Sequence, residues 1–145
     1  MSIRLSEFPE YLAAIPAAAE GDFASARSNL EILLAKVEAK CEPEDLAYLL
    51  QLLGDIEARA GNLETAFSLQ ERALIADSSS PLTLLLCAKS LLGSFQRPDL
   101  ALARLSQAES LLASDKWSPT EHDMSRQWYE REIHAVRQTA LQHEP

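Results

Sequence analysis

The sequence predicts an all-α protein made of about three helical hairpins and a final helix that covers the last of them. Ala and Leu dominate its 145 residues, and only 4 Gly and 7 Pro are present. This composition favours long helices, because Gly and Pro disfavour a helix most. A turn followed by an apolar and then a small residue recurs three times, and the C-terminal stretch is amphipathic. A chain of this length is expected to form a single domain, residues 1–145.

The recurring turns define the expected hairpins. They are Gly21-Asp22-Phe23-Ala24-Ser25-Ala26, Gly61-Asn62-Leu63-Glu64-Thr65-Ala66 and Arg97-Pro98-Asp99-Leu100-Ala101. Their last alanines are 40 and 35 residues apart, in the range of helical-hairpin repeats. A small residue at this place lets two helices approach closely. Gly21 and Gly61 suit a left-handed helix C-cap, and Asp22 and Asn62 suit the N-cap of the helix that follows.

These turns set the expected boundaries of the helices. The hairpins are predicted at about 7–40 (helices 7–20 and 22–40), 43–77 (43–60 and 62–77) and 81–113 (81–94 and 98–113). The final helix is predicted at about 119–142, with Ser118 as its cap, Pro119 at its first position and Glu121 completing a capping box. Pro81 opens its helix in the same way after Ser80. Pro16 lies inside the first predicted helix, so we expect a kink there or a later helix start.

The net charge of the chain limits the kinds of partner that it is expected to bind. The net charge is −9, and residues 1–80 carry 6 Lys/Arg against 14 Asp/Glu, whereas residues 81–145 carry 7 against 8. Nucleic acids and anionic membranes are polyanions that need clusters of Lys and Arg, so neither is expected as a partner. A basic protein partner would be favoured. The alternative is that the acidic surface serves only solubility.

The sequence also predicts a cytoplasmic protein. The N-terminal stretch MSIRLSEFPEY lacks the pattern of a signal peptide, and no apolar run approaches the length of a membrane span. Cys41 and Cys87 are far apart and are expected to be reduced, with one of them in the core.

No motif for catalysis, a cofactor or a metal is found in the sequence. His122, His134 and His143 lack metal-ligand spacing, and Glu130 with His134 is expected to be a surface pair on one helix face. The four glycines are scattered and cannot form a phosphate-binding loop. We therefore expect that the chain is not an enzyme and binds no cofactor or metal.

One segment carries a family resemblance. Residues Ala47 to Ser80 resemble a tetratricopeptide repeat, with matches at Leu50, Leu53-Gly54, Gly61, Leu63, Ala66 and Ala73-Leu74 in the order and spacing of the family. The two flanking hairpins resemble it more weakly. The segment departs from the family at Glu57 and Gln70, where bulky apolar residues are usual, and at Ser78, where proline is common. The resemblance implies a right-handed superhelical stack in which the first helix of each hairpin lines a concave groove.

The resemblance also implies which residues face this groove. They are Phe8, Tyr11, Ile15, Tyr48, Gln51, Asp55, Arg59, Leu82, Leu85, Lys89 and Leu92. Some members of the family clamp a C-terminal carboxylate with Lys, Arg and Asn residues in the groove. At the matching positions this chain has one base, Lys89, beside Tyr11, Ile15, Gln51 and Asp55, so that mode is not expected here.

The expected function is that of a protein-interaction module, a chaperone or adaptor that holds a peptide segment of a protein partner in the groove. The chain also shows a weaker likeness, in length, acidity and terminal helix, to the small acidic three-repeat chaperones of bacterial type III secretion. Two alternatives stay open. One is a structural scaffold that associates with itself, for example as a homodimer, and the other is an immunity or antitoxin protein that masks a basic partner.

Overall fold

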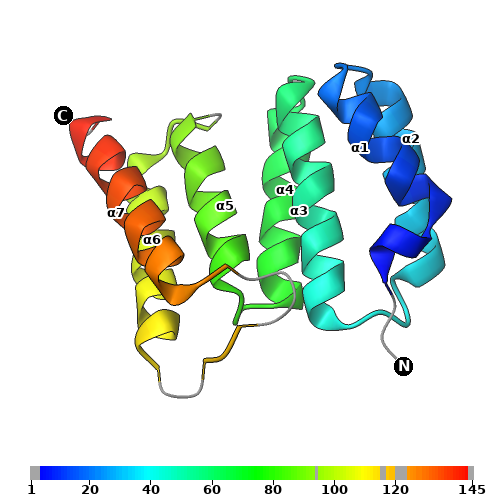
Figure 1. Cartoon of the computed structure of the whole chain (residues 1–145). Helices are drawn as coiled ribbons and strands as arrows, with labels where there is room; N and C mark the ends of the chain where they lie inside the picture. Colours follow the sequence, from blue (N-terminus) through cyan, green and yellow to red (C-terminus); the bar gives the residue numbers. More distant parts are fainter. Residues whose placement is uncertain (1–3, 94, 115–116, 120–123, 144–145) are drawn as a thin grey trace. The chain divides into compact units, whose positions relative to one another are not determined.

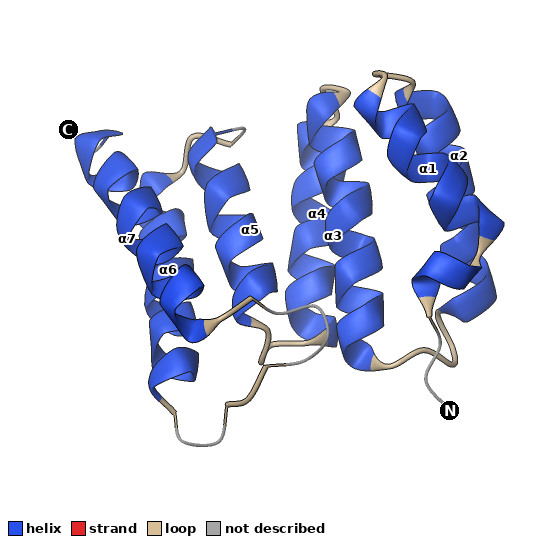
Figure 2. Ribbon diagram, in the orientation of Figure 1, coloured by secondary structure: helices blue, strands red, loops and turns tan. Residues whose placement is uncertain are grey.

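The predicted all-α class is confirmed by a computed structural model that describes residues 4–93, 95–114, 117–119 and 124–143 (Figure 1). These residues contain seven α helices, one short 3-10 helix and no strand (Figure 2). The ends of the first six α helices lie within three residues of the expected positions. The elements are η1 (Leu5–Glu7), α1 (Pro9–Ala19), α2 (Phe23–Val37), α3 (Pro43–Arg59), α4 (Leu63–Ala76), α5 (Pro81–Gly93), α6 (Pro98–Ala113) and α7 (Arg126–His143).

The chain divides into two compact units, Met1–Asp77 and Ser78–Pro145. The first unit holds η1 and the helices α1 to α4, and the second holds α5 to α7. The expected single domain stays a prediction.

The first unit consists of two helical hairpins, α1–α2 and α3–α4, and α2 of the first packs on α3 of the second. Figure 1 shows these helices aligned lengthwise. Their shared core is aliphatic, and the removal of this surface from water is the main term that stabilises the unit. Its fully buried side chains include Leu30, Leu33 and Val37 from α2 and Leu49 from α3.

Both turns of the first unit have the same backbone geometry. Gly21 and Gly61 have φ of +83° and +92°, the left-handed conformation predicted for them. The N–H of Gly21 donates to the Ala18 carbonyl oxygen at 3.1 Å, and the N–H of Asp22 donates to that of Ala17 at 2.8 Å. Gly61 and the residue after it repeat both bonds. This pair of bonds is the Schellman motif, which satisfies the last carbonyl groups of a helix.

The two helices that follow these turns begin differently. The Asp22 carboxylate accepts a hydrogen bond from the Ser25 N–H at 3.2 Å and so caps α2, as predicted. Asn62 occupies the N-cap position of α4, but the predicted cap by its side chain is wrong, because this side chain makes no cap hydrogen bond to α4. Its amide donates instead to Glu57 Oε2 at 3.0 Å, because that buried carboxylate lies within reach at the end of α3.

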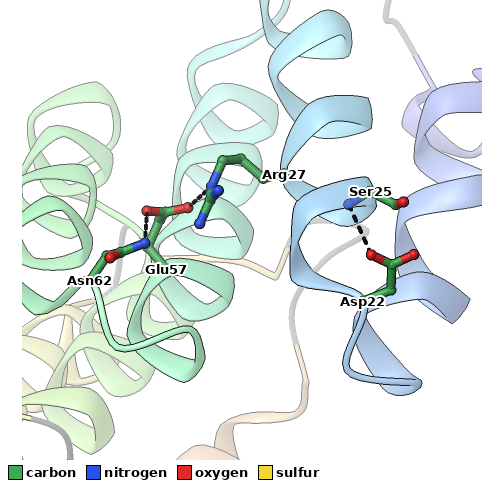
Figure 3. A network of polar contacts seen from close by, with 5 residues as sticks. All are labelled: Asp22, Ser25, Arg27, Glu57 and Asn62. Carbon is green, nitrogen blue, oxygen red and sulfur yellow. Dashed lines mark hydrogen bonds and ion pairs between the residues drawn. The ribbon is translucent and has the colours of Figure 1, made fainter.

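Glu57 is the centre of a polar network that joins the two hairpins (Figure 3). Its side chain accepts from Arg27 Nε on α2 as well as from Asn62, so the carboxylate links α2, α3 and the start of α4. Glu57 is only 6% exposed. A buried carboxylate is tolerated when a cation and a hydrogen-bond donor satisfy it. This network explains why an acidic residue occupies a position expected to be bulky and apolar.

Small residues lie where the helices of each hairpin meet. Ala14, Ala26, Ala66 and Ala73 are all fully buried. A Cβ added at Gly54 would come within 3.0 Å of the Gln70 side chain and 3.3 Å of the Ala66 carbonyl oxygen, so this glycine is needed for the close approach of α3 and α4. Gln70 is 2% exposed, and its stem fills the space that Gly54 leaves. The predicted role of small residues is confirmed.

Pro16 does not displace the start of α1. The helix begins at Pro9 and continues through Pro16 to Ala19. A proline inside a helix removes one backbone hydrogen bond. The side of α1 that carries Pro16 is exposed, so the carbonyl left without this bond can be hydrated.

The second unit pairs α5 with α6, and α7 packs on both. Ser80 caps α5 as predicted, since its hydroxyl accepts from the Thr83 N–H at 3.1 Å. The α5–α6 turn lacks a left-handed glycine. Gln96 takes this conformation instead, with φ of +53°, and the Arg97 N–H donates to the Leu91 carbonyl oxygen at 2.6 Å.

The predicted start of the last helix is wrong. α7 begins at Arg126, and the Ser125 hydroxyl accepts from the Trp128 N–H at 3.1 Å as its cap. Ser118 and Pro119 lie outside a helix, and Glu121 lies outside the described residues. The physical reason is that the buried face of α7, which carries Tyr129 and Ile133, begins here. Arg126, in turn, lies over the ring of Trp117, with its guanidinium carbon 5.4 Å from the ring centre.

The two cysteines are free, as expected, and Cys87 is the buried one, at 2% exposed. Cys41 is half-buried. Its burial, and to a smaller extent the nearby Asp45 carboxylate, raises the pKa of its thiol.

None of the helices in the described ranges combines the length and apolar character that a membrane crossing needs.

Candidate partner-binding surfaces

In the first unit, the structure brings together the first helices of the two hairpins. The hydroxyl oxygens of Tyr11 on α1 and Tyr48 on α3 are 3.2 Å apart and share a hydrogen bond. Both rings are half-buried. Burial, and then the bond to Tyr11, raises the pKa of the Tyr48 phenol, so the Tyr48 hydroxyl is neutral at physiological pH. Two predicted groove residues therefore lie in direct contact.

Arg59 makes a second connection between α1 and α3. Its Nη2 donates to the carbonyl oxygen of Ala18 at 3.1 Å, and its guanidinium carbon lies 5.2 Å from the centre of the Phe23 ring. Its Nη1 is 3.8 Å from Asp55 Oδ2, one turn earlier on α3. Arg59 is thus held by three partners of its own unit, and its charge is balanced by Asp55.

Two large aliphatic side chains of α1 stay in contact with solvent beside this connection. Leu12 is 58% exposed and Ile15 is 43% exposed. They are three residues apart on one helix face, and Ile15 lies one turn after Tyr11. The repeat pattern does not predict Leu12 as a groove residue, although its three-residue spacing from Ile15 is a signal for it. We call the surface formed by the following residues the α1/α3 face: Tyr11, Leu12, Ile15, Tyr48, Asp55 and Arg59.

Two predicted groove residues do not lie on an accessible surface. Gln51 is 4% exposed and Leu85 is 0% exposed, so their side chains are part of the packing. The neighbours Leu52 and Leu86 are half-buried instead. One residue along a helix turns the side chain by about 100°, and this is enough to move it from the open side to the buried side. Leu86 could have been found from Leu82, one turn earlier, which is half-buried as well.

The second unit has a hollow of about 410 Å³ between α5 and α7. Lys89 and Leu92, two residues expected to face the groove, both line it. The Lys89 ammonium donates to Glu132 Oε1 of α7 at 3.0 Å, so the one base at the positions that match the carboxylate clamp is paired. The remaining lining residues are Gly93, Ala135, Val136 and Thr139. The hollow is therefore mainly apolar, with a neutralised ion pair beside it.

A second hollow of about 350 Å³ lies between α6 and α7. Leu112 and Ile133 are among its lining residues, with Glu109, Ala113, Arg126 and Glu130. Arg137 pairs with Glu109 through both guanidinium Nη atoms, one of them at 2.9 Å. This bidentate pair lowers the pKa of the Glu109 carboxyl, chiefly through its hydrogen bonds. The pair fastens α7 to α6 and does not point to a reaction.

The described ranges contain no group of three or more His, Cys, Asp or Glu side chains that could hold a metal ion. His134 is exposed on α7, and His122 lies outside the described residues. Comparison with models of known protein families finds no match, and comparison with curated proteins finds no similar sequence.

Proposed function

We propose that the protein is a tetratricopeptide-like interaction module, a chaperone or adaptor that holds a segment of another protein on the first helices of its hairpins. The observation that carries this proposal is the α1/α3 face. It presents two exposed aliphatic side chains, Leu12 and Ile15, beside a pair of tyrosines and the charges of Asp55 and Arg59. Exposed apolar groups rimmed by polar ones are typical of interaction sites.

The packing of the unit supports the assignment of this face to a ligand. The core is already filled by residues such as Leu30, Leu33 and Leu49, so Leu12 and Ile15 are not needed for it. A partner that covered them would remove apolar area from water, at about 25 cal/mol for each Å². The rigid tyrosine pair and Arg59 would limit the movement of the face on binding. The mainly apolar hollow at Lys89 and Leu92 gives the second unit a surface of the same kind.

The shared turn geometry supports the repeat part of the proposal. Two successive hairpins end their first helices with the same left-handed glycine and the same pair of hydrogen bonds. Fully buried alanines, among them Ala26, Ala66 and Ala101, then follow in the second helices. Such recurrence is expected of repeats that stack into a superhelix. The finer features, the right-handed stack and the cytoplasmic setting, are part of the proposal.

Affinity capture with two matched variants tests the function. Ile15→Glu places a charge on the α1/α3 face, and Ile75→Glu places the same charge on α4, at a residue that is 84% exposed. We expect a protein from the native cell to be retained by the parent chain and by Ile75→Glu, and to be lost from Ile15→Glu. Mass spectrometry identifies it. If no captured protein distinguishes Ile15→Glu from Ile75→Glu, the α1/α3 face is not the binding surface.

A further inference from the structure

The first unit carries nearly all of the net charge of the protein. Residues 1–77 contain 6 Lys/Arg and 14 Asp/Glu, a net of −8 at neutral pH, and residues 78–145 contain 7 and 8, a net of −1. A unit of this size with eight excess charges produces a negative potential that extends over about a Debye length, roughly 8 Å at physiological ionic strength.

Four of the six basic side chains of this unit pair with its own carboxylates. Arg27 pairs with Glu57, Lys36 with Glu10, Arg59 with Asp55 and Arg72 with Glu38. Each pair cancels one charge of each sign, so these four cations do not mask the excess of carboxylates. An approaching molecule therefore meets an acidic unit in which Leu12 and Ile15 are exposed together on α1, whereas the other exposed large aliphatic residues of the unit, Ile32, Leu63 and Ile75, lie on α2 and α4.

We infer that the α1/α3 face takes a positively charged amphipathic helix of a different protein, an inference that rests on the proposed function. Leu12 and Ile15 accept the apolar side of this helix, which carries its anchors at the three- and four-residue spacing of one helix face. Its Lys and Arg residues lie toward the excess carboxylates of the first unit. Complementary charge speeds association and excludes wrong partners more than it adds affinity.

The same charges argue against a second copy of the chain on this face. Two first units in contact would bring two net charges of −8 together, and such like-charge contact is unfavourable. Without this repulsion, Leu12 and Ile15 of two copies of the chain could pack against each other in a homodimer. A basic partner turns this repulsion into attraction. The nearly neutral second unit provides no comparable discrimination by charge.

Three synthetic helices test the inference. Each is a fluorescein-labelled peptide of about 18 residues, or five turns, with the same Leu positions on one face. The polar positions are Lys in the first peptide, Gln in the second and Glu in the third. Fluorescence anisotropy measures their binding to the full chain. We expect the Lys peptide to bind about tenfold or more tightly than the Gln peptide, the Glu peptide to bind least, and the Lys peptide to weaken as salt is added.

The variants Ile15→Glu and Ile75→Glu separate docking from adhesion of a cation to an acidic surface. Both add one negative charge, so simple adhesion would become stronger in both. The inference predicts that Ile15→Glu weakens the Lys peptide about tenfold or more while Ile75→Glu does not weaken it. Circular dichroism verifies that both variants keep the helical content of the parent.

Each other outcome has a defined meaning. If the Gln peptide binds as tightly as the Lys peptide and is lost in Ile15→Glu, the interaction face stands and the basic partner is overturned. Binding that is insensitive to Ile15→Glu overturns both the face and its occupant. A dimer of the parent chain at low salt, detected by light scattering and abolished by Ile15→Glu, would make a second copy the occupant.

Discussion

At the scale of single residues, the conformation of the turns decides which residues the chain can use there. Gly61 takes a φ of +92°, and a Cβ added to it would meet no atom within 4 Å. The requirement for glycine is therefore conformational and not steric. At the third turn, between α5 and α6, Gln96 takes a φ of +53° although it is not a glycine. A residue other than Gly, Asn or Asp in this region costs roughly 1–2 kcal/mol.

The substitution Gly61→Ala tests this distinction. We expect it to lower the free energy of unfolding by about 1 kcal/mol or more, since the alanine must adopt a left-handed conformation. The control is Gly93→Ala at the end of α5, where an added Cβ also meets open space but φ is not positive. This control should be neutral or stabilising by up to about 1 kcal/mol. Urea denaturation measures both, and equal stability of Gly61→Ala and the parent would contradict the argument.

At the scale of elements, α7 is held on the second unit by apolar contact more than by its ion pairs. Tyr129 is fully buried, and its ring meets the rings of Trp117 and Trp128 edge-on, with centres 6.2 Å and 5.3 Å apart. The Arg137–Glu109 pair is partly exposed on both sides. Aromatic pairs add to the burial of apolar area, whereas exposed ion pairs contribute little.

Paired substitutions on α7 measure the two contributions. Tyr129→Ala should lower the free energy of unfolding of the second unit by about 3–5 kcal/mol, because it leaves a large cavity. Arg137→Ala should cost at most about 1 kcal/mol. Thermal unfolding, followed by the tryptophan fluorescence of Trp117 and Trp128, reports on this unit. A larger loss in Arg137→Ala than in Tyr129→Ala would show that the ion pair holds the helix.

The sequence predicted the helices best where several signals coincide. At the first two turns a glycine, an apolar residue and an alanine recur together, and both turns are found as expected. The start of α7 could not be predicted, because Ser118 with Pro119 and Ser125 offer competing caps and tertiary burial of Tyr129 selects the second. Local sequence contains no information on that burial.

The candidate site was predicted in part for a related reason. Tyr48, Asp55 and Arg59 are on the open side of α3, but Gln51 is buried although it is polar. A polar residue is taken as exposed by default, whereas partners from other helices can satisfy it inside. The contact of Tyr11 with Tyr48 joins residues 37 positions apart, and only the packing of α1 beside α3 creates it.

At the scale of the whole molecule, carboxylates that are paired with bases make the stability depend on pH in the acid range. Pairing with a base lowers the pKa of three carboxyl groups, through a hydrogen bond first in each case: Glu10 by Lys36, Asp99 by Arg97 and Glu109 by Arg137. A pKa that is lower in the folded than in the unfolded chain stabilises the folded state at all pH values above the ordinary one, 4.5 for Glu and 3.8 for Asp. This stabilisation is lost as the pH falls through the lowered folded value.

We therefore expect the free energy of unfolding to be nearly constant from about pH 6 to 8 and to decrease below about pH 4.5. The substitution Glu109→Gln removes one titrating carboxylate, so the variant should be slightly less stable than the parent at neutral pH and should lose less stability on acidification. Glu31→Gln, at an exposed position of α2, is the matched control. Urea denaturation at a series of pH values measures the difference.

Since the carboxylates that would attract a basic helix are protonated over the same acid range, binding of the Lys peptide should weaken there too. Affinity that instead rises as the pH is lowered would mean that the negative charge of the first unit plays no part in recognition.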